Sequence, residues 1–395
     1  MNDRSSPPSA NSISRALAPF GETIFTEMSR LAAQHDAVNL GQGFPNFDGP
    51  AFIKQAAIDA INAGHGQYAR MFGIPELNRA IADRFAVDTN ITVDPDRCVS
   101  VTSGCTEAIA ATLFGLLNPG DEIILIEPYY DSYRACVAMA GAAPRFVTLR
   151  PPDFALDEEE LRRAFTSKTR AILINSPHNP TGKVYSRAEL ELIARLCIEH
   201  DVIALSDEVY ERLVFEGKHV SLAALPGMLD RTVTLSSLGK TFSLTGWKIG
   251  WAIAPPALTK GVRAAHQFLT FATATPLQHG AIAALRAPQS YYDQFLAQYR
   301  CRRDIVVSGL REAGFEVFPP SGTYFVMADH TPFGFESDVA FCRHMIEEVG
   351  VAAIPTSVFY HNPADGRALV RFAFCKTDET LKEGLKRIRT RLKRK

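Results

Sequence analysis

One lysine of the chain stands in a setting that could give it a chemical role. Lys240 follows residues 231–235, which predict a short β-strand, and it lies among the small residues of Ser236-Ser237-Leu238-Gly239-Lys240-Thr241. A lysine at a strand end can hold a phosphate as a point charge, or it can form a Schiff base with an aldehyde. Taken alone, a lysine is most often a solvated surface charge. The rest of the sequence must therefore decide which role Lys240 has.

Two nucleotide-binding patterns match only in part. Gly239-Lys240-Thr241 resembles the end of G-x-x-x-x-G-K-[ST], but Thr234 stands where the first glycine should be. Gly41 and Gly43 could begin the dinucleotide pattern G-x-G-x-x-G, but Asn46 occupies the position of its third glycine. The sequence therefore disfavours both a P-loop and a nicotinamide dehydrogenase.

Chemically useful side chains follow several predicted strands. The strands are expected near residues 98–102, 122–126, 171–175, 202–206 and 232–235, with amphipathic helical segments between most of them. Apolar runs that alternate with helices indicate a mostly parallel sheet covered on both faces. Ligands bind outside the carboxyl ends of such strands. The residues expected there are Ser103, Gly104, Cys105, Thr106, Tyr129, Tyr130, Asn179, Asp207, Val209, Tyr210, Ser237 and Lys240.

These groups together suit a phosphorylated pyridine aldehyde. The backbone N–H groups of a helix that begins near Gly104 favour a phosphate, and Lys240 can take the aldehyde. Asp207 can hold the pyridine nitrogen protonated, and the cationic ring then acts as an electron sink. Asn179 and Tyr210 can donate hydrogen bonds to the phenolic oxygen of the ring, and Tyr130 can stack on it. We therefore expect pyridoxal 5′-phosphate as the cofactor.

The chain resembles the fold-type I, class I pyridoxal-phosphate-dependent aminotransferases. The resemblance rests on the order and spacing of Asn179-Pro180-Thr181-Gly182, Asp207-Glu208-Val209-Tyr210, Ser237-x-Gly239-Lys240 and Arg371-Phe372. A closer similarity, to the kynurenine/glutamine and methionine aminotransferases, rests on residues 39–45, 67–68, 127–133, 244–248 and 351–355. The resemblance implies an α/β fold, with a mostly parallel central sheet sandwiched by helices in a large domain and a smaller α+β domain.

The resemblance also implies roles for individual residues. Lys240 would form the Schiff base and then shuttle a proton between substrate and cofactor. Arg371 would grip the substrate α-carboxylate as a bidentate fork, helped by Asn179 and the backbone of Gly43. The cofactor would be held by Gly104, Cys105, Thr106, Tyr130, Asn179, Asp207, Val209, Tyr210, Ser237 and Lys248, with Tyr68 reaching the neighbouring site of a homodimer. The pocket for the substrate side chain would contain Phe25, Phe44, Tyr129 and Phe271.

The expected reaction is transamination between a large neutral L-amino acid and a 2-oxo acid. Methionine, glutamine, aromatic amino acids and kynurenine are the candidate donors, because no second arginine marks a dicarboxylate site. An apolar pocket separates such donors weakly, so broad specificity is expected. Two alternatives with the same cofactor remain open. They are an N-succinyldiaminopimelate aminotransferase and a C–S β-lyase that acts on cysteine conjugates.

Composition and charge limit the kinds of partner and the cellular compartment that the chain suits. The formal net charge is −1 at pH 7, which gives no basic surface for nucleic acid or anionic membranes. No apolar run is long enough to span a bilayer, and residues 1–10 lack the apolar core of a signal peptide. The seven scattered cysteines include no C-x-x-C pair, so we expect neither disulfides nor a metal site, and a cytoplasmic protein. The short segment before Pro19 disfavours a regulator with an attached DNA-binding module.

Three regions are expected along the chain. Residues 1–45 would form an N-terminal arm and part of a small domain, residues 46–290 the large cofactor-binding domain, and residues 291–395 the small α+β domain. In the last region the sequence predicts helices at 294–313, 339–349 and 380–391, and strands at 315–319, 323–328 and 368–374.

Overall fold

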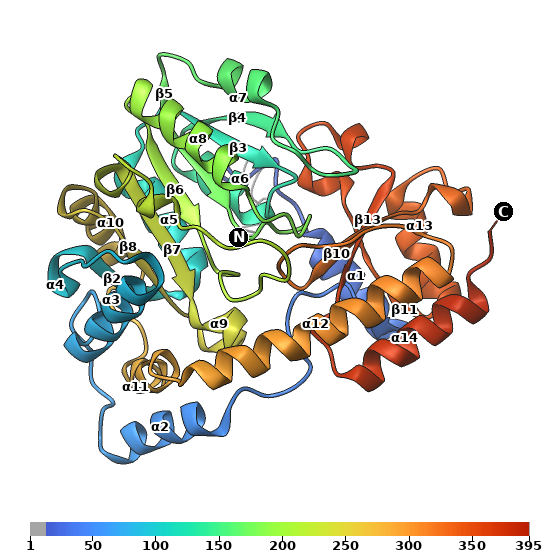
Figure 1. Ribbon diagram of the computed structural model, residues 1–395, viewed down its shortest axis with the longest axis horizontal. Helices are drawn as coiled ribbons and strands as arrows, with labels where there is room; N and C mark the ends of the chain where they lie inside the picture. Colours follow the sequence, from blue (N-terminus) through green and yellow to red (C-terminus); the bar gives the residue numbers. More distant parts are fainter. Residues whose placement is uncertain (1–12, 395) are drawn as a thin grey trace, which may run out of the picture.

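A seven-stranded sheet forms the centre of the molecule (Figure 1). The computed structural model describes residues 13–394. The strands of this sheet are β2 (Val99–Ser103), β3 (Glu122–Glu127), β4 (Ala143–Thr148), β5 (Thr169–Asn175), β6 (Ile203–Asp207), β7 (Thr232–Ser237) and β8 (Ile249–Ile253), in the order β2-β8-β7-β6-β5-β3-β4. Only β8 runs antiparallel to its neighbours. The carboxyl ends of the other six strands therefore lie along one edge.

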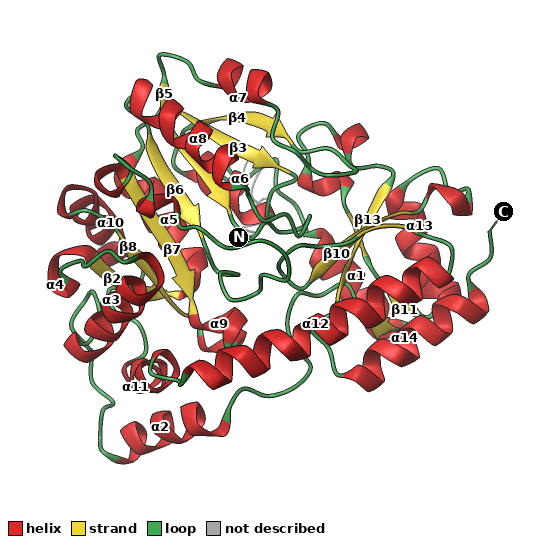
Figure 2. Ribbon diagram, viewed as in Figure 1, coloured by secondary structure: helices red, strands yellow, loops and turns green. Residues whose placement is uncertain are grey.

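Helices cover both faces of this sheet, as Figure 2 shows. Strand β3 sends Ile123 and Leu125 into one apolar core and Ile124 and Ile126 into another, because successive side chains of a strand point to opposite faces. Burying one such side chain contributes roughly 1.5–3 kcal/mol. The first core is closed by α5 (Gly104–Leu116), α6 (Asp131–Met139) and α10 (Pro256–Leu269). The opposite face is covered by α3 (Pro75–Thr89), α7 (Glu158–Ala164), α8 (Arg187–Glu199) and α11 (Thr275–Leu285). The predicted helix-covered, mostly parallel sheet is thus confirmed.

A smaller antiparallel sheet lies beside the central one. Its strands, in the order β12-β13-β10-β9, are β9 (Glu316–Phe318), β10 (Phe325–Asp329), β12 (Ile354–Pro355) and β13 (Leu369–Ala373). The helices around it are α1 (Ile24–Gln34), α12 (Gln289–Glu312), α13 (Asp338–His344) and α14 (Asp378–Arg391). Strand β1 (Val38–Asn39) pairs with β11 (Val351–Ala352), so an N-terminal segment joins the C-terminal part of the chain.

Helix α12 connects the two sheets, and in Figure 1 it runs beneath the central sheet toward β10 and β13. It begins after Pro288, earlier than the predicted start at residue 294. The proposed domain division between residues 290 and 291 lies in its first turn and stays a prediction. The predicted helix at 339–349 ends as an α-helix at His344 and continues as a π-helical turn to Val349, where Gly350 follows with φ +77°.

Short elements complete the fold. The remaining helices are α2 (Ala51–Asn62), α4 (Pro95–Cys98) and α9 (Leu238–Thr241), and single 3₁₀ turns occur at Leu222–Ala224, Leu229–Arg231, Thr245–Trp247, Thr331–Phe333, Ser357–Phe359 and Pro363–Asp365. Between residues 13 and 394, no helix combines the length and apolar composition that a membrane span requires.

Candidate active site

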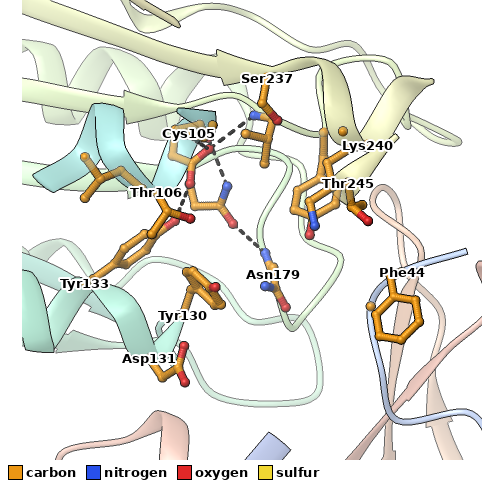
Figure 3. A pocket seen from close by; sticks show the side chains of 18 of the residues that line it. Phe44, Cys105, Thr106, Tyr130, Asp131, Tyr133, Asn179, Ser237, Lys240 and Thr245 are labelled. Carbon is orange, nitrogen blue, oxygen red and sulfur yellow. Dashed lines mark hydrogen bonds between the residues drawn. The ribbon is translucent and has the colours of Figure 1, made fainter. Parts of the chain in front are cut away.

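A cavity of about 470 Å³ lies at the carboxyl ends of the central strands, facing the small sheet. Residues from both ends of the chain line it, as do residues that follow β2, β3, β5, β6 and β7 (Figure 3). The predicted site residues on its wall are Phe25, Gly43, Phe44, Gly104, Cys105, Thr106, Tyr130, Asn179, Asp207, Val209, Tyr210, Ser237, Lys240, Lys248 and Arg371. The parallel strands therefore bring together side chains that are far apart in the sequence.

Lys240 is carried into this cavity by α9, which begins directly after β7. Its Nζ lies 5.6 Å from the centre of the Tyr210 ring and 5.7 Å from that of Tyr324. Burial lowers the pKa of Lys240, although negative neighbours such as Asp207 oppose the shift. A lowered pKa leaves a larger fraction of the amine neutral at a given pH, and the neutral amine is the form that attacks a carbonyl carbon.

The carboxylate of Asp207 is fixed by hydrogen bonds at the end of β6. It accepts one of 2.6 Å from Tyr133 Oη and one of 3.2 Å from the backbone N–H of Val209, and Cys105 Sγ lies 3.7 Å away. Burial raises the pKa of Asp207, and the hydrogen bonds from Tyr133 and Val209 oppose that shift. A protonated ring nitrogen placed against this carboxylate would favour its ionised form.

Tyr133 is a site residue that the sequence reasoning missed. It lies on α6, one helical turn after Tyr130, and so shares a face with that predicted residue. The three-residue spacing from Tyr130 was the sequence signal that could have identified Tyr133.

Asn175 is a second residue of the site that the sequence reasoning missed. Its side-chain amide donates to the backbone oxygen of Asp207 at 2.9 Å, and its oxygen accepts from the backbone N–H of Asn179 at 2.7 Å. Thr23, Asp131, Thr245 and Phe325 are further lining residues that were not predicted.

Arg371 lies on β13 with only 2% of its surface exposed. Its two terminal nitrogens donate to Asn179 Oδ1 at 3.1 Å and to the carbonyl oxygen of Gly41 at 2.8 Å. The predicted backbone helper, Gly43, lines the cavity, but its carbonyl oxygen accepts from Tyr324 Oη instead. Within the described residues Arg371 forms no ion pair, and its Nε has no hydrogen-bond partner. The guanidinium is thus a buried cation with a donor left for an incoming carboxylate.

Aromatic rings surround the guanidinium of Arg371. The centres of Phe325, Phe25 and Phe359 lie 4.1, 5.2 and 5.5 Å from its central carbon. Burial lowers the pKa of Arg371 to about 10, so the group remains a cation at neutral pH. The apolar setting strengthens its attraction for a carboxylate because little water competes there.

The other end of the cavity is built for an anion. Gly104 begins α5 with φ +75°, and a Cβ there would lie 3.2 Å from Lys248 Nζ. A Cβ on Gly250 would lie 2.4 Å from the carbonyl carbon of Gly104, so this turn packs directly against β8. The backbone N–H groups of Cys105 and Thr106 are in the first turn of α5, where they have no partner within the helix. With Lys248 and Ser237 they form a donor set that fits a phosphate.

The donors and acceptors at the two ends of the cavity fit pyridoxal phosphate. The phosphate would lie against the start of α5, the ring nitrogen against Asp207 and the aldehyde carbon near Lys240. The substrate carboxylate would reach Arg371. Within residues 13–394, no cluster of three or more metal-ligating side chains is present.

Three predicted residues do not line this cavity. Tyr129 is 2% exposed and stacks on Phe146 with ring centres 5.8 Å apart, so it belongs to the core rather than to the substrate pocket. Tyr68 and Phe271 contact each other edge to face at 5.4 Å, and 84% and 45% of their surfaces are exposed. Their predicted roles would need a second subunit. Phe44 lies at the far rim from Tyr130 in Figure 3.

Comparisons with known proteins agree with this geometry. A family model described as aminotransferase class I and II matches residues 35–388. The probable N-succinyldiaminopimelate aminotransferase of Mycobacterium tuberculosis is 48% identical over 384 residues, which cover 94% of this chain and 96% of the relative. The methionine aminotransferase of Escherichia coli K12 is 39% identical, with 94% and 97% covered. Kynurenine–oxoglutarate transaminase 1 of Homo sapiens is 39% identical, with 90% and 93% covered.

Solved structures of aminotransferases share the fold of this chain over nearly its whole length. The N-succinyldiaminopimelate aminotransferase from Mycobacterium tuberculosis superposes with a TM-score of 0.94 at 47% identity and covers 96% of this chain and 99% of its own. An Escherichia coli protein identified as having a methionine aminotransferase function superposes with a TM-score of 0.92 at 39% identity, with 95% and 99% covered.

Proposed function

Because this chain belongs to the aminotransferase class I and II family, and is therefore a transaminase that uses pyridoxal 5′-phosphate, we propose that its amino donors are large neutral L-amino acids. The observation that carries this proposal is the charge of the cavity wall. Arg371 is the only arginine among the described residues that line it, and in this proposal it binds the α-carboxylate of the donor. The other lining side chains include aromatic rings and the carboxylate of Asp131, and none of them is a second arginine for a side-chain carboxylate.

The residues of the site divide the work of the reaction. When bound, pyridoxal phosphate supplies an electron sink that stabilises negative charge at the substrate α-carbon. Arg371 binds the α-carboxylate, and Asn179 orients the guanidinium through the bond to its Oδ1. Lys240, with its lowered pKa, can accept a proton from the α-carbon and return it elsewhere. Asp207 holds the positive charge of the ring nitrogen, and Tyr133 fixes its carboxylate.

A half-reaction screen tests the proposal. Single amino acids are mixed with the holoenzyme without an acceptor, and the visible absorption band of the bound cofactor is followed. We expect rapid loss of the band with methionine, glutamine and phenylalanine, and slow loss with aspartate and glutamate. A band that none of the neutral donors changes, although the enzyme is loaded with cofactor, would contradict the donor assignment. Pyruvate and ammonia released from cysteine conjugates would instead indicate β-lyase activity.

A second candidate donor is N-succinyl-diaminopimelate. The 48% identity to the Mycobacterium tuberculosis protein favours it. This donor carries carboxylates far from its reacting amine, and the described wall offers no second arginine for them, whereas Asp131 would repel them. The same screen discriminates the two, because a rate with the succinylated donor at least about tenfold above that with methionine would favour the second candidate.

The assembly and the location are further parts of the proposal. Tyr68 is exposed beside Phe271, outside the cavity of its own chain, which supports a homodimer in which Tyr68 reaches the phosphate of the neighbouring site. All seven cysteines are free, which supports a reducing cytoplasmic location.

A further inference from the structure

A second cavity, of about 490 Å³, lies on the opposite face of β7 from the core that contains α5. It is bounded by α3, by the loop after β6, by β7 and β8, and by the start of α12. It shares Ser237 with the transamination site, but Lys240, Asp207 and Arg371 do not line it. The chemistry proposed above therefore leaves this cavity without a role.

The wall that β7 gives to this cavity is polar. Val233 and Leu235 point into the apolar core on one face, whereas Thr234 and Ser236 point to the other. A central strand covered by helices is normally apolar on both faces. Thr234 is 4% exposed, and its hydroxyl has no hydrogen-bond partner among the described residues. A buried polar group without a partner is costly, so this hydroxyl indicates a wall that contacts water or a ligand.

Two of the three carboxylates in the cavity, Asp88 and Glu208, already have close ion-pair partners or short hydrogen bonds. Asp88 pairs with Arg84 at 2.6 Å and also with Arg212. Glu208 accepts hydrogen bonds of 2.8 Å from two serine hydroxyls, those of Ser206 and Ser221, and lies 3.0 Å from His219 Nε2.

Glu211 differs from these two carboxylates. Within the part of the chain that the structure describes, it forms no ion pair, and its side-chain hydrogen bond is a long one of 3.4 Å from Ser236 Oγ. Burial raises the pKa of Glu211 to about 7.

Cationic and titratable side chains also line the cavity, namely Arg84, Arg212, Lys218 and His219. Arg84 and Arg212 pair with Asp88, and His219 pairs with Glu208. Glu211 is thus a partly buried carboxylate with no ion-pair partner of its own among the described residues, on the same wall as the unpartnered hydroxyl of Thr234. A positively charged donor would satisfy both groups.

We propose that this second cavity binds a small organic ammonium ion, whose nitrogen pairs with Glu211 and donates to the hydroxyls of Thr234 and Ser236. The rings of Phe242 and Trp251 line the same cavity and suit both a cation and a short alkyl chain, whereas the ring of Tyr292 is already contacted by the guanidinium groups of Arg84 and Arg212. The volume lies within the range of small-molecule sites. This site goes beyond the transamination proposed above and does not depend on which donor that reaction uses.

The test uses N,N-dimethylbutylammonium and the holoenzyme at about pH 8.5, where Glu211 is ionised. A tertiary amine cannot form a Schiff base with the cofactor, so its binding in the active site by that route is excluded. Isothermal titration calorimetry is expected to show saturable binding. Glu211→Gln should weaken it by about tenfold or more, since a hydrogen bond to a charged group is lost. Thr234→Val, which keeps the shape, should weaken it by a smaller factor.

The controls separate the loss of the Glu211 charge from other effects of a substitution. Glu216→Gln removes a carboxylate from the same loop, but that side chain is 66% exposed and paired with Arg303, so affinity should not change. The neutral alcohol 1-pentanol should bind wild-type enzyme at least about tenfold more weakly than the amine. This comparison uses only the wild-type enzyme, so it does not depend on the folding of a variant. No saturable binding of the amine to wild-type holoenzyme, or equal affinity in Glu211→Gln, would overturn the proposal and leave a water-filled cavity.

Discussion

At the scale of single residues, the site depends on groups that hold its charged atoms in place. Asp207 receives its shortest hydrogen bond from Tyr133, which lies 74 positions away in the sequence. Arg371 is similarly oriented by Asn179, which lies in the connection after β5 of the central sheet. Such partners fix the orientation and charge of the group they contact, and a hydrogen bond to a charged group contributes about 1.5–3 kcal/mol. Substitution of Tyr133 tests this view, and substitutions of Arg371 and Lys240 test the charged groups themselves.

Tyr133→Phe removes the 2.6 Å hydrogen bond to Asp207 but keeps the ring. We expect cofactor affinity and kcat each to fall by about tenfold, because the carboxylate loses the bond that most opposes the effect of burial on its pKa. Equilibrium dialysis of the cofactor and steady-state kinetics measure the two effects. Tyr185→Phe is the matched control, since that buried tyrosine lies outside the cavity. Unchanged cofactor affinity in Tyr133→Phe would refute the role.

Arg371→Lys keeps the charge but loses the planar fork. We expect the KM for the amino donor to rise by about tenfold or more, while cofactor affinity stays near the wild-type value, because Arg371 lies at the substrate end of the cavity. Titration with donor and with cofactor separates the two. A larger loss of cofactor affinity than of donor affinity would show that Arg371 does not act mainly on the carboxylate of the donor.

Lys240→Ala should abolish transamination while the chain still folds, because the amine is the proposed nucleophile and proton carrier. Turnover with methionine measures the first effect, and circular dichroism together with gel filtration measures the second. Substantial remaining turnover in a folded variant would contradict the assignment.

At the scale of elements, a buried charged pair joins α5 to α10. His266 Nδ1 lies 2.6 Å from Glu107 Oε1, and His266 Nε2 lies 2.8 Å from the backbone oxygen of Met71. Glu107 also accepts hydrogen bonds from the backbone N–H of Ser103 and from the hydroxyl of Thr270. Since a carbonyl oxygen only accepts, Nε2 must carry a proton, and an ionised Glu107 requires a second one on Nδ1. The pair therefore ties the start of α5 to neighbouring segments.

This pair predicts a pH dependence of stability. Burial lowers the pKa of His266, but Glu107 outweighs that effect and raises it above its ordinary value of 6.5. Its contribution is thus fully present below about pH 6.5 and is lost as pH rises through the folded pKa. Burial raises the pKa of Glu107, but the bonds from His266 and Thr270 outweigh it and lower the pKa below 4.5. That contribution is lost as pH falls through the lowered value.

Urea unfolding of wild type and His266→Gln between pH 5 and 9 tests the pair. We expect the variant to lose about 3–5 kcal/mol near pH 6, as is usual when one partner of a buried pair is removed, and the difference to shrink at alkaline pH. Glu191→Gln, which breaks an exposed pair with Arg187 on α8, should cost at most about 0.5 kcal/mol. A difference that does not vary with pH would show that His266 acts through packing alone.

The elements also show how far sequence reasoning could reach. The motif-based resemblance to class I aminotransferases is confirmed, and so is the mostly parallel sheet, because β3 and β5 contain continuous apolar segments and helical segments alternate with the strands. Tyr129 and Tyr130 could not be distinguished, since they lie in an irregular connection where no alternation tells which ring points inward. The bond between Tyr133 and Asp207 depends on the tertiary placement of α6 near the end of β6, which no local pattern reveals.

At the scale of the whole molecule, an apolar patch lies at the end of α10. Phe268 is 86% exposed there, and Leu269 and Phe271 are 43% and 45% exposed, with Tyr68 against Phe271. Exposed groups of this kind commonly mark an interface. We expect the protein to sediment as a dimer. Phe268→Asp should shift the equilibrium toward monomer, whereas Ile198→Asp on α8 should not. Sedimentation velocity measures both, and a monomeric wild type would refute the proposed assembly.

Helix α12 has a mechanical consequence. Its 24 residues span about 36 Å at 1.5 Å per residue, from the edge of the central sheet to the sheet that carries Arg371. A rod of this length acts as a lever. A tilt of about 5° at its first turn would displace its far end by about 3 Å, if the helix stays straight. Small changes around Pro288 would thus be magnified at the far end of the rod, and the distance between Arg371 and Lys240 could be tuned from a place that touches neither.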